Sequence, residues 1–261
     1  MENQELYKML ADATNEYRKL LKNELNARWE SLNLDLMKSA EYEVIWGLVS
    51  RQCSLVYEMS YSYLTWNDFF LPIIMRCMVE NHINISWILQ KPDERAKMFI
   101  EYGLGRETKH LEFAKAKKVK EEIDLKFIEN TEIWINQQRF SFLNKINVGS
   151  WKFNDVRNTA IDAGYKEYYD IFYDVCSSAT HSTWNYIAKH NLKFCESPFH
   201  KAHRIPVIKE PEIEIGLFLI LTKILQDTFE KIDKELNIKI TEPSSFEYIM
   251  NAFNKENKIN T

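Results

Sequence analysis

Glycine and proline are scarce in this sequence, with six of each in 261 residues. Together they make up about 5% of the chain where roughly 12% is average, so turn-forming residues are too few for a fold of many short strands. The hydrophobic residues, 45% of the chain, are enough for a sizeable core. The composition therefore predicts long helices and an all-α fold.

The sequence has few cysteines, and no two of them lie at the spacing of a metal-binding or redox motif. The four, at positions 53, 77, 176 and 195, form no C-x-x-C motif, which argues against a thiolate metal site and a disulfide framework. The N-terminal MENQELYKML lacks the basic and apolar regions of a signal peptide. The longest apolar run, 213–225, is shorter than the roughly 20 residues that span a bilayer. We expect a cytoplasmic protein without membrane contact.

Positive charge is not in excess, since 34 Lys and Arg stand against 38 Asp and Glu, a net charge of −4. Such a protein has no overall positive field to attract a nucleic acid. Any contact with RNA must come from a local group of basic residues.

Hydrophobic residues recur every three or four positions along most of the chain, which is typical of amphipathic helices. Asn67 or Asp68 can cap a helix with Pro72 in its first turn, and Pro92 can begin the next helix. No internal repeat or flexible linker divides the chain. We predict a single helical domain over residues 1–261, a bundle of about eight to nine helices. Its parts are an N-terminal helical hairpin over 1–65, a core over 66–206 and C-terminal helices over 207–261.

Other local signals refine this prediction. Asn154 is expected to cap a short helix that ends at Gly164, where a positive φ is favoured. Gly103 and Gly105 indicate a kink or close packing within the helix that begins at Pro92. Residues 165–189 are expected to form one helix, and 195–211, with three prolines, to be irregular.

The most informative segment carries polar side chains four residues apart: Tyr169, Tyr173, Ser177 and His181. In an α-helix each four-residue step drifts only about 40° around the axis, so these side chains project from one side. Two other predicted helices repeat the spacing, with the pairs Arg76 and Glu80, and Tyr102 and Arg106. If the three helices meet, these groups form either a structural polar network or a functional site.

As a functional site, this group offers acid–base chemistry. Histidine is the residue type that most often serves as a general acid or base, and we expect this role for His181. Arg76 or Arg106 can hold an anion in a bidentate manner. The basic segment with His200, His203 and Arg204 can contribute further binding groups. Its H-x-x-H spacing lacks the helical geometry and the glutamate of a zinc motif, so we expect no metal.

Nucleotide and hydrolase motifs are missing as well. The glycines at 103 and 105 form no phosphate-binding loop, and no G-x-S-x-G sequence is present. We therefore expect no cofactor.

Over about 72–206 the chain resembles a bacterial all-helical family, domain-of-unknown-function family 5677. The order of residues carries the resemblance: Arg76 and Glu80, Trp87, Pro92 to Ala96, Tyr102, Trp151, Gly164, Tyr169, Tyr173, Ser177, His181, His200 and Pro206. It implies that Arg76, Glu80, Tyr173, Ser177 and His181 are family features, and it supplies no activity.

A looser similarity is to the helical ribonuclease superfamily of toxin and phage-defence systems. Its members place a His four to six residues after an Arg, as Arg76 and His82 do here. This similarity implies an RNA-cleaving effector that associates with itself through a helix face, as a homodimer.

Two hypotheses follow. In a metal-independent ribonuclease, His181 or His82 would be the base, Tyr173 the acid and Arg76 the cation, with RNA held by a local basic rim at 200–204. In a non-catalytic helical module, the polar network is structural and the protein binds a partner protein or small ligand. In the second case loss of His181 lowers the melting temperature. The tryptophans at 66, 87, 134, 151 and 184 are the candidate anchors for a partner.

Overall fold

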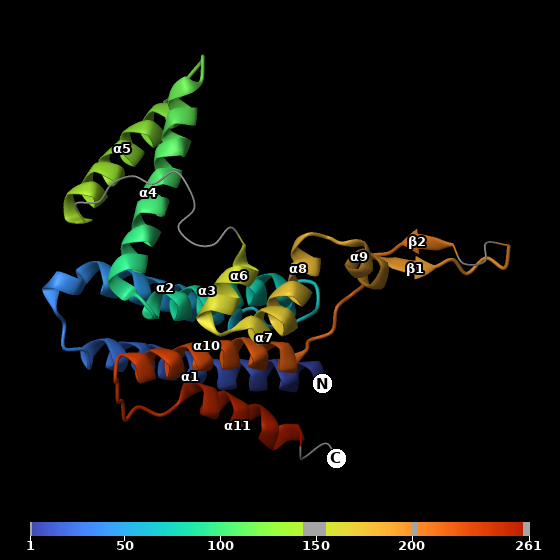
Figure 1. The fold of residues 1–261 in the computed structure, drawn as a ribbon. Coiled ribbons are helices and arrows are strands. Elements are labelled where there is room, and N and C mark those ends of the chain that lie inside the picture. Colours follow the sequence, from blue (N-terminus) through green and yellow to red (C-terminus); the bar gives the residue numbers. More distant parts are fainter. Residues whose placement is uncertain (1, 143–154, 200–202, 258–261) are drawn as a thin grey trace.

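The computed structural model describes residues 2–142, 155–199 and 203–257, and helices dominate them (Figure 1). The predicted all-α, multi-helix fold is confirmed. The longer helices are α1 (Glu2–Glu30), α2 (Ser39–Met59), α3 (Leu71–Leu89), α4 (Pro92–Ala116), α5 (Glu122–Phe142), α10 (Ile215–Glu235) and α11 (Ser245–Asn257). The shorter elements are η1 (Leu36–Lys38), η2 (Tyr63–Thr65), α6 (Val156–Ala163), α7 (Lys166–Tyr168), the π-helical turn η3 (Tyr169–Tyr173), α8 (Asp174–Thr180) and α9 (Trp184–His190).

Helix α3 is the central element. Every residue from His82 to Leu89 is buried, so the second half of α3 is covered on all sides. Helices α2, α6, α8 and α10 supply that cover by packing against α3. Because α3 touches so many neighbours, its polar side chains must find partners on other helices.

The turn between α2 and α3 is held by Trp66, which is fully buried. Its ring stacks on Phe218 of α10 with the centroids 4.0 Å apart. Its Nε1 donates a hydrogen bond to the backbone oxygen of Met59 at 2.8 Å. Burial of an aromatic pair of this kind contributes about 0.5–1.5 kcal/mol beyond the area that it removes from water.

Buried charges fasten the N-terminal hairpin to the C-terminal helices. Arg28 of α1 donates to Asp233 of α10 through Nε at 2.9 Å and Nη2 at 3.0 Å. Glu24 accepts from the backbone N–H of Ser245 at 3.0 Å, where α11 begins. Its carboxylate therefore takes up a free N–H at the helix N-terminus. As a result, α1 packs on α11 and contributes to the main core.

Most of the helix boundaries that glycine and proline predict are confirmed. Asn67 accepts hydrogen bonds from the two backbone N–H groups just before α3, and Pro72 lies in its first turn. Pro92 begins α4. Gly164 follows α6 with a φ of 81°, the left-handed conformation that glycine adopts at little cost. The cap of α6 is Asp155 and not the expected Asn154, since the Asp155 side chain accepts from the backbone N–H of Asn158, the third residue of the helix.

Two of the predicted segments are wrong. The single helix expected over 165–189 is interrupted by η3 and ends at Thr180, because Ser182 has a φ of 49° and turns the chain before α9. The segment 195–211 is not wholly irregular, since β2 (Arg204–Pro206) pairs antiparallel with β1 (Leu192–Phe194). Strands of three residues are too short to show an alternating pattern.

Two hairpins project from the helical body (Figure 1). Helix α4 rises steeply from α2, and α5 folds back along it. The β1–β2 hairpin extends beyond α9 on another side. Over the described ranges, no helix combines the length and hydropathy needed to cross a membrane.

Candidate functional site

The predicted polar group on α3 meets the predicted polar group on η3 and α8. Arg76 donates from Nη2 to the Tyr173 hydroxyl at 2.7 Å and from Nε to Ser177 Oγ at 3.1 Å. The Tyr173 hydroxyl donates to Glu80 Oε2 at 3.3 Å. These four residues, called the Arg76 cluster below, join positions about 100 residues apart in the chain. The structure therefore brings together four of the five predicted catalytic residues.

The π-helical turn places Tyr173 in this cluster. The backbone N–H of Asp174 bonds to the oxygen of Tyr169, five residues back, in place of the usual four. Tyr169 lies on the same side, with its ring stacked on that of Tyr173 at 5.1 Å. Such turns are rare and frequently occur at functional sites.

Burial controls the electrostatics of the cluster. Tyr173 is only 6% exposed, and burial followed by the charge of Glu80 raises the pKa of its hydroxyl well above the usual value. The hydroxyl stays protonated at neutral pH and remains a donor to Glu80. A phenol held in this state is a weak general acid near pH 7, because an efficient catalytic acid has a pKa near the working pH.

His181 lies outside the hydrogen-bonded cluster. It follows α8 directly, and its backbone N–H bonds to the oxygen of Ser177 at 2.9 Å. Its side chain is exposed and makes no hydrogen bond, ion pair or ring contact within the described part of the chain. The predicted base is therefore open to solvent, one helical turn after Ser177.

The other predicted binding residues lie elsewhere. On α4, Arg106 donates to the Tyr102 hydroxyl at 3.2 Å, and within the described residues neither side chain forms a hydrogen bond with the Arg76 cluster. His203 and Arg204 are exposed on the projecting β-hairpin, where the Arg204 guanidinium stacks 4.8 Å from the Phe194 ring centroid. His200 lies outside the described residues.

His82 is a core residue. It is fully buried on α3, and its Nδ1 lies 2.8 Å from Thr228 Oγ1 of α10. Its ring stacks on Tyr168, with Tyr165 at its edge. Burial lowers the pKa of His82 to about 4. The side chain is neutral at pH 7 and closed to any substrate, so the spacing of Arg76 and His82 does not describe a shared site.

Sequence reasoning missed a second cluster that closes the corner between α3, α4 and α6. Asp162 accepts from Trp87 Nε1 at 2.8 Å and from Arg95 Nη2 at 3.1 Å. Arg95 also stacks 3.9 Å from the Trp87 ring centroid. The resemblance singled out Trp87 and Arg95, but nothing in the local sequence pointed to Asp162, since it follows no motif and acts across 67 residues.

A cavity of about 250 Å³ lies beside the Arg76 cluster. Its walls include Met75 of α3 and Phe172, Cys176 and Ala179 from η3 and α8, so it opens on a neighbouring face of α8. Within the described ranges, no three His, Cys, Asp or Glu side chains are grouped as metal ligands.

The fold and the site define an all-helical protein whose central helix is joined to a π-helical turn by a half-buried arginine. The model of a family of unknown function, DUF5677, matches residues 42–198, more than half of the chain, and the protein belongs to this family. The matched region contains the Arg76 cluster and the Trp87–Arg95–Asp162 cluster. No curated protein and no solved structure matches the chain significantly.

Proposed function

We propose that this protein is a non-catalytic helical module that binds a small ligand or a partner protein, and that the Arg76 cluster is structural. The observation that carries the proposal is how the cluster is bonded. Arg76 directs Nε and Nη2 at protein acceptors, and Ser177 Oγ donates to the Tyr173 backbone oxygen at 2.7 Å. A guanidinium committed in this way joins two helices and has less capacity left for a phosphate.

The candidate anchors for a partner fall into two groups. Trp66 and Trp87 are buried, so they contribute to the core. Trp134 is 43% exposed and Trp184 is 67% exposed, so both can reach a partner. Trp151 lies outside the described residues. A large aromatic side chain left partly in water is a frequent anchor in interfaces.

One observation favours a second candidate function, a cytoplasmic effector of a toxin or phage-defence system with ribonuclease-like chemistry. His181 is exposed one turn after Ser177, close in sequence to the residues that fix Arg76. In this proposal His181 is the acid or base and Arg76 stabilises the charged transition state. His82 has no role in it because it is buried. His203 and Arg204 would form the described part of the basic rim for RNA.

Two variants separate the proposals: Tyr173→Phe inside the cluster and His181→Ala outside it. The structural proposal expects Tyr173→Phe to cost about 1–3 kcal/mol, a fall in melting temperature of about 2–10 °C. The sequence-based expectation that loss of His181 lowers the melting temperature no longer applies, because the His181 side chain is exposed and lies outside the cluster. The structural proposal therefore expects His181→Ala to change the melting temperature little. Calorimetry measures both, and neither the wild type nor the variants should cleave total RNA in the presence of a metal chelator.

The effector proposal expects a different result. The wild type would then cleave RNA without metal, and His181→Ala would lose about 10²–10⁴-fold in rate at an unchanged melting temperature. That outcome would overturn the structural proposal.

A further inference from the structure

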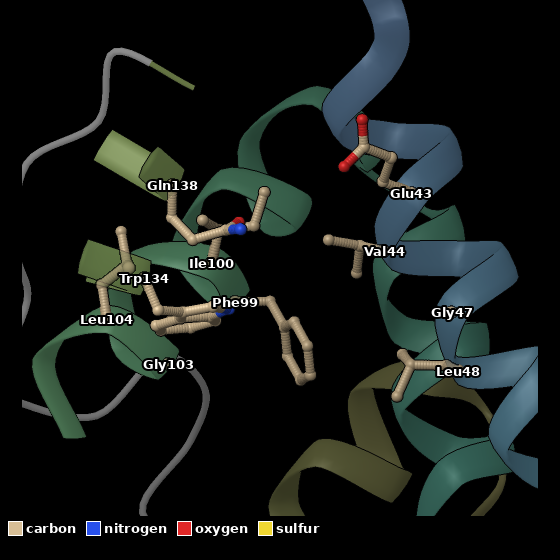
Figure 2. A pocket seen from close by; sticks show the side chains of 10 residues that line it. All are labelled: Glu43, Val44, Gly47, Leu48, Phe99, Ile100, Gly103, Leu104, Trp134 and Gln138. Atoms are coloured by element: carbon tan, nitrogen blue, oxygen red, sulfur yellow. The ribbon is translucent and has the colours of Figure 1, made fainter. Parts of the chain in front are cut away.

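An apolar cavity lies where the α4–α5 hairpin leaves α2. The cavity there has a volume of about 370 Å³, within the range of small-molecule sites. Figure 2 shows it as a gap between two walls. Val44 and Leu48 of α2 face Phe99 and Ile100 of α4 across the gap.

Two glycines keep the cavity open. Gly47 of α2 and Gly103 of α4 both line it, and a Cβ atom added at either position would meet no atom within 4 Å. Neither glycine is therefore required for close packing, one of the two alternatives expected for Gly103. Each costs about 1 kcal/mol in a helix relative to alanine. Both leave the helix surface bare on the cavity side, so a flat ligand can lie against it.

The lining also specifies the chemistry of a ligand. Phe99 and Trp134 supply aromatic surface, and no basic residue lines the cavity. Its only ionisable lining group is Glu43, which Figure 2 places at one end of the gap. Glu43 and Gln138 make no hydrogen bond or ion pair within the described ranges, so both are available to a ligand.

We propose that this cavity binds a planar aromatic amine, with the ring system between α2 and α4 and the ammonium group at Glu43. An aromatic body gains from burial against Phe99 and from contact with Trp134. A cation gains from the carboxylate and from the face of an indole, whereas an anion meets only an acidic group. This inference rests on the proposed function as a binding module and names a site and a ligand class for it.

The test is isothermal titration of the full chain with three probes of matched shape: naphthylmethylamine, naphthylmethanol and naphthylacetate. We expect the amine to bind at least about tenfold more tightly than the alcohol, and the acetate to bind most weakly. Glu43→Gln should remove the preference for the amine over the alcohol while leaving alcohol binding in place. Equal binding of the amine and the acetate to the wild type overturns the proposed ligand class.

A second pair of variants tests the location. Gly47→Leu places a side chain in the cavity and should weaken amine binding by at least about tenfold. The matched control is Gly216→Leu, because Gly216 is also a helical glycine with open space at its Cβ position and lies outside this cavity. If Gly47→Leu and Gly216→Leu bind the amine equally, or no probe binds below about 1 mM, the site is wrong. Such a failure is distinct from failure of the proposed function, which would show as RNA cleavage that depends on His181.

Discussion

The Arg76 cluster makes a quantitative prediction about stability, which a double-mutant cycle of Arg76→Met and Tyr173→Phe can measure. Arg76→Met keeps most of the packed stem and removes two hydrogen bonds, to Tyr173 at 2.7 Å and to Ser177 at 3.1 Å. Hydrogen bonds from a charged donor contribute about 1.5–3 kcal/mol each when buried. Because Arg76 is half-buried, we take the lower end and expect a loss of about 2–3 kcal/mol.

Tyr173→Phe removes the same 2.7 Å bond together with the 3.3 Å bond to Glu80, and should cost about 1–3 kcal/mol. The two variants share the Arg76–Tyr173 contact, in which the guanidinium also lies 4.6 Å from the ring centroid. The double variant should therefore lose less than the sum of the two losses, by a coupling energy of about 1–2 kcal/mol. Urea unfolding followed by circular dichroism gives all four free energies.

The chain offers a matched control for this cycle. Arg106 and Tyr102 form the same kind of contact, with a hydrogen bond of 3.2 Å and a guanidinium 5.9 Å from the ring centroid, but Arg106 is exposed. Arg106→Met and Tyr102→Phe should show no resolvable coupling, because water replaces an exposed contact at little cost. Absence of resolvable coupling between Arg76→Met and Tyr173→Phe, as in the control cycle, would refute the view that the Arg76 cluster stabilises the fold.

Two further predictions concern buried ionisable groups. Arg28→Met leaves the carboxylates of Glu24 and Asp233 without their cation. The free energy of unfolding, measured in urea, should therefore fall by about 3–5 kcal/mol. A fall below about 1 kcal/mol would contradict a stabilising role for the ion pairs of Arg28. His82 has a pKa of about 4 in the folded protein and 6.5 in the unfolded chain. Between these pH values the unfolded state binds more protons than the folded state. The free energy of unfolding therefore falls as the pH drops from about 6.5 to 4. The loss should reach about 3 kcal/mol, and His82→Asn should reduce the slope of stability against pH in this window; an unchanged slope contradicts the assignment.

Local signals in the sequence predict those parts of the fold that local chemistry decides. Pro72, Pro92 and Gly164 lie at helix ends because their backbone preferences act on the residues next to them. The break at Ser182 has no such signal. A serine adopts its φ of 49° only when the surrounding structure imposes it, so no propensity could predict this turn.

The candidate site, too, could be predicted from the sequence only in part. The four-residue spacing predicts that Tyr173 and Ser177 share a face, and Arg76 with Glu80 share another, since a helix periodicity is a local property. Which faces meet depends on packing. Tyr102 and Arg106 have the same spacing as the other pairs, yet α4 leaves the body after its first turns. Tyr102 packs against the main core and accepts a hydrogen bond from Arg106, so the two form a pair separate from the Arg76 cluster.

The π-helical turn explains why side chains four residues apart stay on one side of the element over two successive steps, from Tyr169 to Tyr173 and from Tyr173 to Ser177. In an α-helix four residues overshoot a full turn by about 40°, so two steps would move Ser177 about 80° away from Tyr169. A turn with hydrogen bonds to the fifth residue is wider, and four residues in it fall short of a full turn. The step from Tyr169 to Tyr173 lies in η3 and the step from Tyr173 to Ser177 lies largely in α8, so the two drifts oppose each other. This compensation keeps Tyr169 and Ser177 on the same side of the element as Tyr173, while the next step to His181 leaves α8 and places the imidazole in solvent.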